Sequence, residues 1–364
     1  MEETGSSEFL GVPRSSSESL GGYNRVMALR LSLVALFVAT VAFGQAGPGA
    51  VPSPAGVDAA QPFLSTTADG RVLLSWLEPV GEKQVALKFA TFDGGRWSAP
   101  RTIASRADLF VNWADFPSVV ADAKGTLFAH WLQKSSAGTY SYDVHVTSSS
   151  DGGKSWRADR LLNTDGKQAE HGFVSIVPLP KGGVGALWLD GRAMAGGEHG
   201  GHGGHAGHGG GEMMLRYANL DAGLNVSGES QLDTRVCECC ATSMTMTAVG
   251  PVAVYRDRSA EEIRDIGVVR RTGAKWTAPA LVHRDGWKIK GCPVNGPQLD
   301  ARGNGVAVAW FTAAASPRVN VAFSRDAGAT FGTPVRIDSG NPAGRVDVLM
   351  LANGSALVTW IESA

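Results

Sequence analysis

The eight residues SSDGGKSW, positions 149–156, decide the fold. The same spacing of serine, aspartate, glycine and an aromatic residue returns in SRDAGATF, positions 324–331. An aspartate at this place can accept hydrogen bonds from the amides of a tight turn, and glycine tolerates the positive φ that such a turn needs. We interpret both stretches as structural turns whose aromatic residue packs between sheets. TFDGGRWSAP, with Trp97, and RTGAKWTAP, with Trp276, are partial copies.

A second phrase recurs between these turns. A glycine-, aspartate- or asparagine-containing turn is followed by a short apolar strand that ends in an aromatic residue. Its copies are RVLLSW, TLFAHW, VGALW, PVAVY, VAVAW and ALVTW, which end at Trp76, Trp131, Trp188, Tyr255, Trp310 and Trp360. Six copies at a spacing of roughly 50 residues indicate six supersecondary units, and short alternating strands with glycine turns predict antiparallel sheets.

Together these motifs resemble those of the sialidase-like BNR/Asp-box superfamily, over about residues 61–364. The resemblance implies an all-β, six-bladed β-propeller of sialidase-like type, with four strands per blade. Five blades have the sequence for four strands, but the last shows only RVDVLML and ALVTW. Residues 45–60 are a candidate for its outer edge, although their proline and glycine content suits a strand poorly.

The N-terminal region has the features of an export signal. MALRLSLVALFVATVAFGQA starts at Met27, with Arg30 before an apolar run and small residues at Ala42 and Gly44. We predict a leader or over-extended start at 1–26, a signal peptide at 27–44, a linker at 45–60 and the propeller at 61–364. The expected location is the periplasm or the exterior, with no membrane anchor after cleavage, because the apolar run is short for a span.

Composition excludes some partners. The chain of 364 residues has 33 basic and 34 acidic residues, and neither a basic stripe nor a long block of like charge appears. Nucleic acid is therefore not an expected partner. The 47 glycines and 10 tryptophans suit a turn-rich β protein.

The unusual residues fall in segments that a propeller places on one face. These are the crossings between blades and the loops after each second strand, where binding sites commonly lie. We predict a ligand-binding set there from VNWADFP, YRDRSAEEIRD and GCPVNGP, consisting of Trp113, Asp115, Arg256, Arg258, Arg264 and Asn295. A salt-bridged loop around the arginines, with Asp257, Glu261 and Glu262 as partners, is the structural alternative.

The four cysteines belong to the same face. Cys237, Cys239 and Cys240 crowd into VCECC, and Cys292 lies in the next crossing, so we expect the two segments to meet. In an extended segment Cys237 and Cys239 would point the same way, which suits a shared soft metal ion such as copper, with zinc as the alternative. The other interpretation is a disulfide between Cys292 and Cys239 or Cys240, and one disulfide would leave two thiols.

Histidines form a second candidate metal-binding feature. His199, His202, His205 and His208 recur at every third position in the glycine-rich insertion at 196–211. Such tracts are typical of metal binding, and a flexible one suits capture or delivery rather than a defined site. His171, at the start of a strand, is a further candidate ligand, although a packed structural role is the simpler interpretation.

The resemblance also implies a test for enzyme activity. Sialidases of the superfamily use three arginines on the substrate carboxylate, a tyrosine nucleophile with a glutamate, and an aspartate acid/base. No arginine lies between Gln45 and Gly70, and Tyr255 is the last tyrosine. The clamp and the late nucleophile are therefore not found.

We accordingly expect an exported propeller that binds a transition metal, copper before zinc, in capture or delivery. Its partner would be a periplasmic metal-accepting or redox protein. The alternatives are an exo-sialidase-type glycoside hydrolase that uses Asp115 with Arg256 and Arg264, and a protein-binding platform.

Overall fold

The computed structural model describes residues 49–195 and 211–363. The chain divides into two units, Met1–Ala50 and Val51–Ala364, and every described strand belongs to the second. Apart from one short 3-10 turn, η1 (Arg192–Met194), the regular structure of these residues is β-strand. Within the same ranges, no helix has the length and hydrophobicity needed to cross a bilayer.

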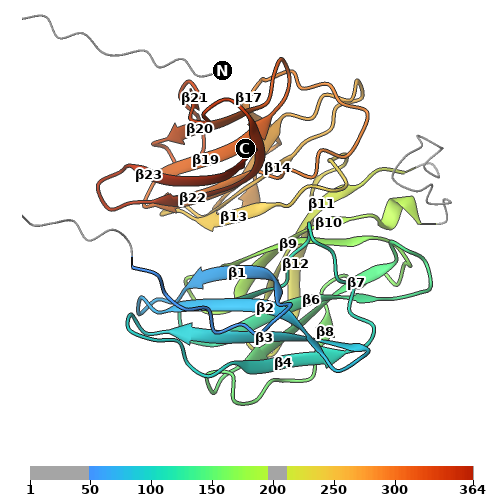
Figure 1. Cartoon of the computed structure of the whole chain (residues 1–364). Helices are drawn as coiled ribbons and strands as arrows, with labels where there is room; N and C mark the ends of the chain where they lie inside the picture. Colours follow the sequence, from blue (N-terminus) through green and yellow to red (C-terminus); the bar gives the residue numbers. More distant parts are fainter. Residues whose placement is uncertain (1–48, 196–210, 364) are drawn as a thin grey trace, which may run out of the picture. The chain divides into compact units, whose positions relative to one another are not determined.

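Antiparallel sheets follow one another along the chain (Figure 1). The first contains β1 (Ala60–Thr66), β2 (Val72–Val80), β3 (Gln84–Phe92) and β4 (Arg101–Arg106). The second contains β5 (Ser118–Ala121), β6 (Leu127–Lys134), β7 (Tyr142–Ser149) and β8 (Arg160–Leu161). The third contains β9 (His171–Pro178), β10 (Val184–Asp190), β11 (Met214–Leu220) and β12 (Val226–Asp233). In each, neighbours in sequence are neighbours in the sheet.

The remaining sheets differ in strand number. The fourth contains β13 (Ser243–Met246), β14 (Pro251–Arg256), β15 (Ile266–Thr272), β16 (Lys275–Trp276) and β17 (Ala280–His283), with β17 paired to β15. The fifth contains β18 (Gln298–Arg302), β19 (Gly305–Thr312), β20 (Arg318–Ser324) and β21 (Val335–Arg336). The sixth contains only β22 (Pro342–Met350) and β23 (Ala356–Glu362), as expected. Residues 49–59 form no strand, so they do not complete it.

The first strands of successive sheets are joined by hydrogen bonds. The bonds run from Ser65 Oγ to the Val119 carbonyl (2.6 Å), from the Leu299 amide to Ser243 Oγ (3.2 Å) and from the Met350 amide to the Asp300 carboxylate (2.7 Å). These bonds connect β1 with β5, β13 with β18, and β18 with β22. The arrangement is that of the expected β-propeller, with first strands side by side and the later strands of each sheet further out.

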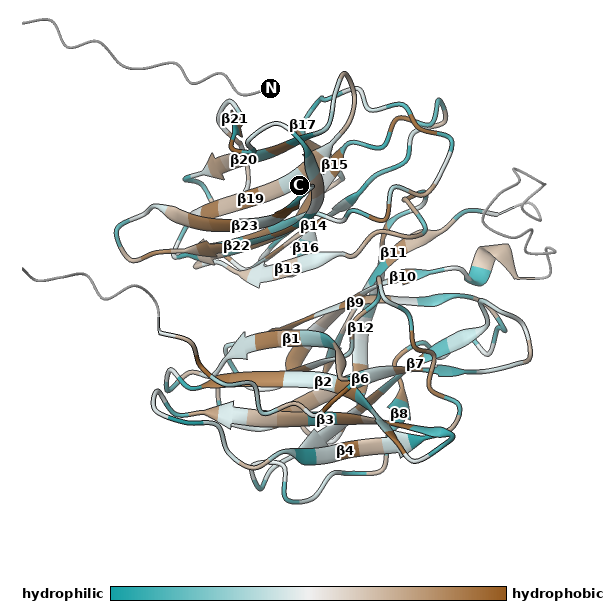
Figure 2. Cartoon of the chain, viewed as in Figure 1, coloured by the Kyte–Doolittle hydropathy of each residue, from teal (hydrophilic) through white to brown (hydrophobic). Residues whose placement is uncertain are grey.

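Aromatic residues at the ends of the second strands fill the space between sheets. Trp76, Trp188 and Trp310 are at most 1% exposed, and brown, hydrophobic stretches run along the inner strands of the sheets (Figure 2). The Trp76 and Trp188 indoles donate to Glu78 and Asp190, each two residues further along (2.8 Å). The indole N–H groups of Trp76 and Trp188 therefore have partners, which removes the penalty of burying them.

The turn motifs are built as their sequence predicts. Asp151 accepts hydrogen bonds from the Lys154 amide (3.0 Å), the Ser155 amide (3.0 Å) and the Ser155 hydroxyl (2.6 Å), while Gly153 has φ of +79°. Asp326 accepts from the amide and hydroxyl of Thr330 in the same way (2.9 and 2.6 Å). These motifs stabilise the turn between the third and fourth strands and do not contribute to the site described below.

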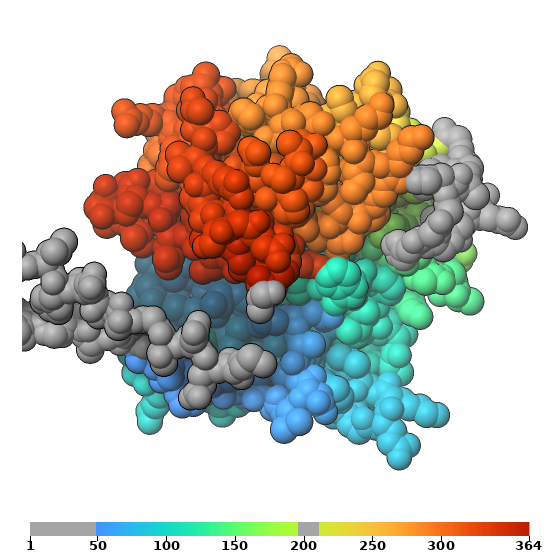
Figure 3. All heavy atoms as spheres, turned by 45° about the horizontal axis from the view of Figure 1, so that its top comes forward, coloured from blue at the N-terminus to red at the C-terminus, as the bar shows by residue number. Residues whose placement is uncertain are grey.

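The sixth sheet meets the first part of the propeller through a side-chain contact. The Arg345 guanidinium of β22 lies 4.2 Å from the ring centroid of Trp113, in the crossing before β5. Figure 3 shows the red C-terminal strands bordering the blue and teal segments. Leu349, Leu357 and Ile361 of this sheet are more than half exposed. Trp113, a predicted ligand-binding residue, thus has a stacking partner within the chain.

Candidate metal centre

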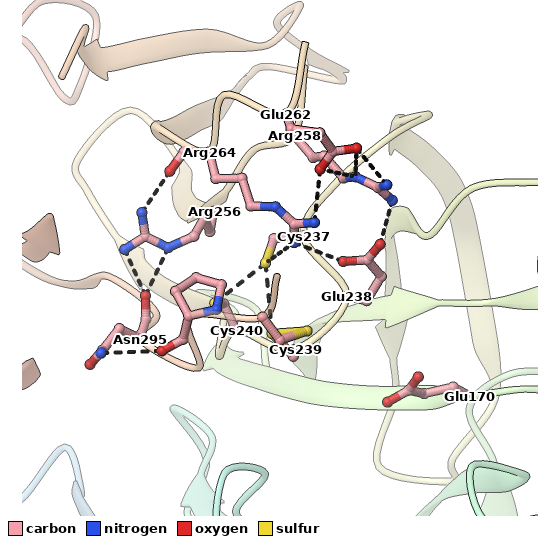
Figure 4. Close-up of a disulfide and its surroundings, with 12 residues drawn as sticks. Glu170, Cys237, Glu238, Cys239, Cys240, Arg256, Arg258, Glu262, Arg264 and Asn295 are labelled. Atoms are coloured by element: carbon pink, nitrogen blue, oxygen red, sulfur yellow. Dashed lines mark hydrogen bonds and ion pairs between the residues drawn. A yellow bond between two sulfur atoms is a disulfide. The ribbon is translucent and has the colours of Figure 1, made fainter. Parts of the chain in front are cut away.

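The cysteines meet between two crossings of the propeller. Cys237, Cys239 and Cys240 follow β12, and Cys292 follows β17. Cys239 and Cys292 form a disulfide with a Cα–Cα distance of 5.9 Å, within the usual range (Figure 4). Cys237 and Cys240 are free and buried. The expected meeting of the two segments is confirmed, and the mixed interpretation, one disulfide with two thiols, is the one the structure shows.

A turn, not an extended segment, brings the free thiols together. Glu238 and Cys239 form the turn, which places Cys237 Sγ 3.5 Å from Cys240 Sγ and 3.8 Å from Cys239 Sγ. The three sulfur atoms all lie within 4.8 Å of one another. The prediction of an extended segment that aligns Cys237 with Cys239 was therefore wrong in its geometry, since the close free pair is Cys237 with Cys240.

Arg264 places a positive charge beside the Cys237–Cys240 pair. Its guanidinium donates to Cys237 Sγ at 3.0 Å and to the Glu238 carboxylate at 2.9 Å. Burial acts to raise the pKa of Cys237, but the Cys240 thiol and the Arg264 charge outweigh it and lower that pKa to about 7. Burial and the neighbouring Cys237 sulfur raise the pKa of Cys240 well above its ordinary value. Cys237 is therefore the thiol of the pair that ionises first, beside the positive charge of Arg264.

The predicted arginine set is engaged by the protein itself. Arg256 is 2% exposed and donates to the carbonyls of Asn295 (2.7 and 2.9 Å), Phe311 (2.8 Å) and Arg264 (2.6 Å). Arg258 pairs with Glu262 (2.7 Å), Glu212 (3.2 Å) and Glu238. With Arg264 on Cys237 and Glu238, none of the three points into open space as a carboxylate clamp needs. The salt-bridged alternative holds for Glu262, whereas Glu238 and Glu212 take the place of the predicted partners Asp257 and Glu261.

The side chains of Asn295 and Asp115 make hydrogen bonds to neighbouring segments of the chain. The Asn295 side chain accepts from the Arg345 amide (3.0 Å) and donates to the Ala343 carbonyl (3.3 Å). Asp115 is 2% exposed; one oxygen accepts from the Phe173 amide (2.6 Å), and the other has no hydrogen-bond partner. Burial, with the charge of Glu170, raises the pKa of Asp115 to about 8. Asp115 is thus a buried acid that is protonated at neutral pH.

His171 belongs to a different group of residues from the cysteines. Its ring contacts Asp165 (3.1 Å), Asp143 (3.4 Å) and Asp190 (3.7 Å). Asp165, His171 and Asp190 have the spacing of a metal site, but Arg192 already pairs with Asp190 (2.7 Å) and Asp165 (3.1 Å). The guanidinium supplies the positive charge that a cation would bring. His171 is therefore placed apart from the cysteine cluster, in an ion-pair network.

Of the histidine-rich insertion at 196–211, only Gly211 is described. His199, His202, His205 and His208 lie outside the described residues. At the end of the insertion, the Met213 carbonyl accepts from the Val236 amide (2.9 Å), and Glu212 pairs with Arg258 (3.2 Å) and Arg235 (3.5 Å). The described C-terminal end of the insertion is thus fastened directly beside the cysteine segment.

Comparison with known proteins agrees with this architecture. The model of the BNR repeat-like domain matches residues 80–283, more than half of the chain. The chain belongs to this BNR repeat-like family. No curated protein is significantly similar to the chain in sequence.

Solved structures share the fold at low identity. A protein of unknown function from Dyadobacter fermentans is 15% identical, with a TM-score of 0.51 over 79% of this chain and 85% of its own. The K499G mutant of NanB sialidase from Streptococcus pneumoniae is 12% identical, with a TM-score of 0.51 over 85% and 66%. The chain spans 60% of the Hadza microbial sialidase Hz136, at 14% identity and a TM-score of 0.48. The chain therefore has a sialidase-like BNR fold, and these similarities extend to the fold alone.

Sequence reasoning missed two acidic residues. Glu238, inside VCECC, holds both Arg258 and Arg264 in place. Glu170 accepts from the Tyr142 hydroxyl (2.7 Å), and burial raises its pKa to about 7. Glu170 precedes His171 in a crossing between sheets, which was the available signal. The contacts of Glu238 depend on a turn that the sequence does not reveal.

Proposed function

We propose that this BNR repeat-like protein is an exported propeller whose buried Cys237–Cys240 pair binds copper(I) in metal capture or delivery. The observation that carries the proposal is the 3.5 Å approach of two free, buried sulfur atoms. Thiolates are soft ligands that select copper(I), zinc and iron–sulfur clusters among metals. A buried pair offers such an ion a dry, sulfur-rich environment.

Charge favours copper(I) over zinc at this pair. Two thiolates around a monovalent ion leave one net negative charge, which the Arg264 guanidinium 3.0 Å from Cys237 Sγ would neutralise. A divalent zinc ion ordinarily takes four ligands. Here Cys239 and Cys292 are held in a disulfide, so two protein thiols remain. Both arguments support a copper(I) site with two sulfur ligands.

The insertion supports a role in gathering metal. Met213 and Glu212, which directly follow the insertion, contact the cysteine segment and its Arg258 partner, which supports a connection between the insertion and the pair. We propose that the histidines of the insertion collect ions and pass them to the thiols. Delivery to a periplasmic metal-accepting or redox protein would complete the path. Location in the periplasm or outside the cell is part of the same proposal and has its support in the signal-like segment at 27–44.

Anaerobic titration with copper(I) against a chromogenic chelator tests the proposal. Wild type is expected to take one tightly bound ion, whereas Cys237→Ser and Cys240→Ser lose it because a single thiolate remains. The matched control is the Cys239→Ser/Cys292→Ser double variant, which removes the disulfide and should keep the ion. Deleting residues 196–211 should remove only weaker binding. Undiminished tight binding in the Cys237→Ser/Cys240→Ser double variant would refute a cysteine site.

A further inference from the structure

The disulfide and the free thiols lie close enough to exchange. Cys237 Sγ is 3.8 Å from Cys239 Sγ, which is bonded to Cys292, and 3.5 Å from Cys240 Sγ. The four sulfur atoms therefore form one connected chain, from Cys240 through Cys237 and Cys239 to Cys292. Cys237 and Cys240 stand in a Cys-x-x-Cys arrangement, the spacing of many dithiol redox centres.

Exposure differs along this chain of sulfur atoms. Cys237 and Cys240 are at most 1% exposed, Cys239 is 8% exposed, and Cys292 is exposed. An external thiol or disulfide can therefore reach Cys292 but not the inner pair. Whatever redox exchange the inner pair makes with solution must pass through the outer disulfide.

We infer that the four cysteines form a dithiol–disulfide relay, in which the buried Cys237–Cys240 dithiol exchanges with external disulfides through Cys292. In the first step the Cys237 thiolate attacks Cys239 Sγ; the Cys237–Cys239 bond forms, the Cys239–Cys292 bond breaks, and Cys292 leaves as a thiolate. In the second step the Cys240 thiolate attacks Cys237 Sγ and Cys239 leaves. Two protons pass from Cys237 and Cys240 to Cys239 and Cys292, and no electrons are gained or lost.

The relay then has a defined external reaction. The Cys239 and Cys292 dithiol attacks an external disulfide, reforms its own disulfide and releases two thiols. The net result is an oxidised inner pair and a reduced external disulfide, which an external thiol reverses by the same path. This activity goes beyond metal binding and does not depend on it, because each step uses only the sulfur atoms described above.

Trapping with N-ethylmaleimide under native, metal-free and thiol-free conditions tests the relay. Cys292 begins in a disulfide and cannot react with the reagent, but each first step releases it as an exposed thiolate that is capped irreversibly. We therefore expect the label on Cys292, at a rate independent of protein concentration. Trypsin resolves the products, because Cys237, Cys239 and Cys240 share peptide 236–256 whereas Cys292 lies in 291–302.

Two variants locate the steps. Cys240→Ser should still release Cys292, with the disulfide stopped between Cys237 and Cys239, whereas Cys237→Ser should leave Cys292 unlabelled. In wild type the disulfide should end between Cys237 and Cys240. If Cys292 of wild type stays unlabelled while the protein remains folded by circular dichroism, the relay is wrong. Equal labelling in Cys237→Ser would overturn it as well, and neither outcome bears on copper binding.

Discussion

A few buried charged residues hold the crossings that form the site. Arg256 donates four hydrogen bonds, to the Asn295, Phe311 and Arg264 carbonyls. Its forked guanidinium donates at once to the Arg264 carbonyl, in the loop after β14, and to the Asn295 carbonyl, in the crossing after β17. The point charge of a lysine would not make both contacts. Arg264, beside it, balances the charge on Cys237. Both arginines thus hold the cysteine segments in place.

Asp115 gives a test of this description at a single residue. Its pKa, about 8, lies above that of an unfolded aspartate, so its contribution to stability is present below about pH 4 and is lost as the pH rises through 8. Asp115→Asn keeps an oxygen for the Phe173 amide and removes this ionisation. Because wild type loses about 1.4 kcal/mol per pH unit up to pH 8, we expect the stability difference to shift toward the variant by on the order of 4 kcal/mol between pH 5 and 9.

Urea unfolding at several pH values measures that gain. Asp58→Asn, at an exposed position, is the matched control and should follow wild type throughout. Parallel stability curves for Asp115→Asn and wild type would show that Asp115 is ionised in the folded protein, contrary to its burial.

Among the strands, stability is unevenly distributed. β19 is buried along nearly its whole length, with Trp310 at 0% exposure. The sixth sheet has two strands, and Leu357 of β23 is 55% exposed. β19 is therefore packed on both faces, whereas the exposed face of the sixth sheet contributes little to the core.

Paired substitutions measure this difference. Trp310→Ala leaves a cavity and removes the indole donor to one oxygen of Asp285, and should cost about 3–5 kcal/mol. Leu357→Ala removes atoms already in contact with water and should cost less than about 1 kcal/mol. Chemical denaturation of both variants compares them. A loss at Leu357 as large as that at Trp310 would mean that the exposed face is covered in solution.

The strands were more predictable than the site. Alternating apolar residues followed by an aromatic residue mark the second strands β2, β6, β10, β14, β19 and β23. The pattern is visible in the sequence because each of these strands buries its apolar side chains between neighbouring sheets. The meeting of Cys292 with VCECC followed from the order of crossings. The turn at Glu238 did not, since a short polar segment between strands has no periodicity to reveal its backbone. The ion pairs of Arg258 with Glu212 and Glu238 depend on this turn, so the sequence did not predict them either.

Considered as a whole molecule, the propeller brings distant segments to one place. The crossings after β12 and β17 are separated by 53 residues at the disulfide, yet their cysteines lie side by side. Glu212, at the end of the histidine-rich insertion, joins the same charge network through Arg258. The fold thus brings the thiols and the counter-charge of Arg264 to one place.

The most direct test of the central claim is copper X-ray absorption on the anaerobic protein, loaded with one equivalent of copper(I). The variant lacking residues 196–211 should be used, so that the histidines of the insertion are absent. Gly211 lies against Ala193, so the ends of the deletion are close enough to join. The account predicts a first shell of two sulfur atoms and no nitrogen, because Cys237 and Cys240 supply the ligands. A first shell made of nitrogen or oxygen would contradict it.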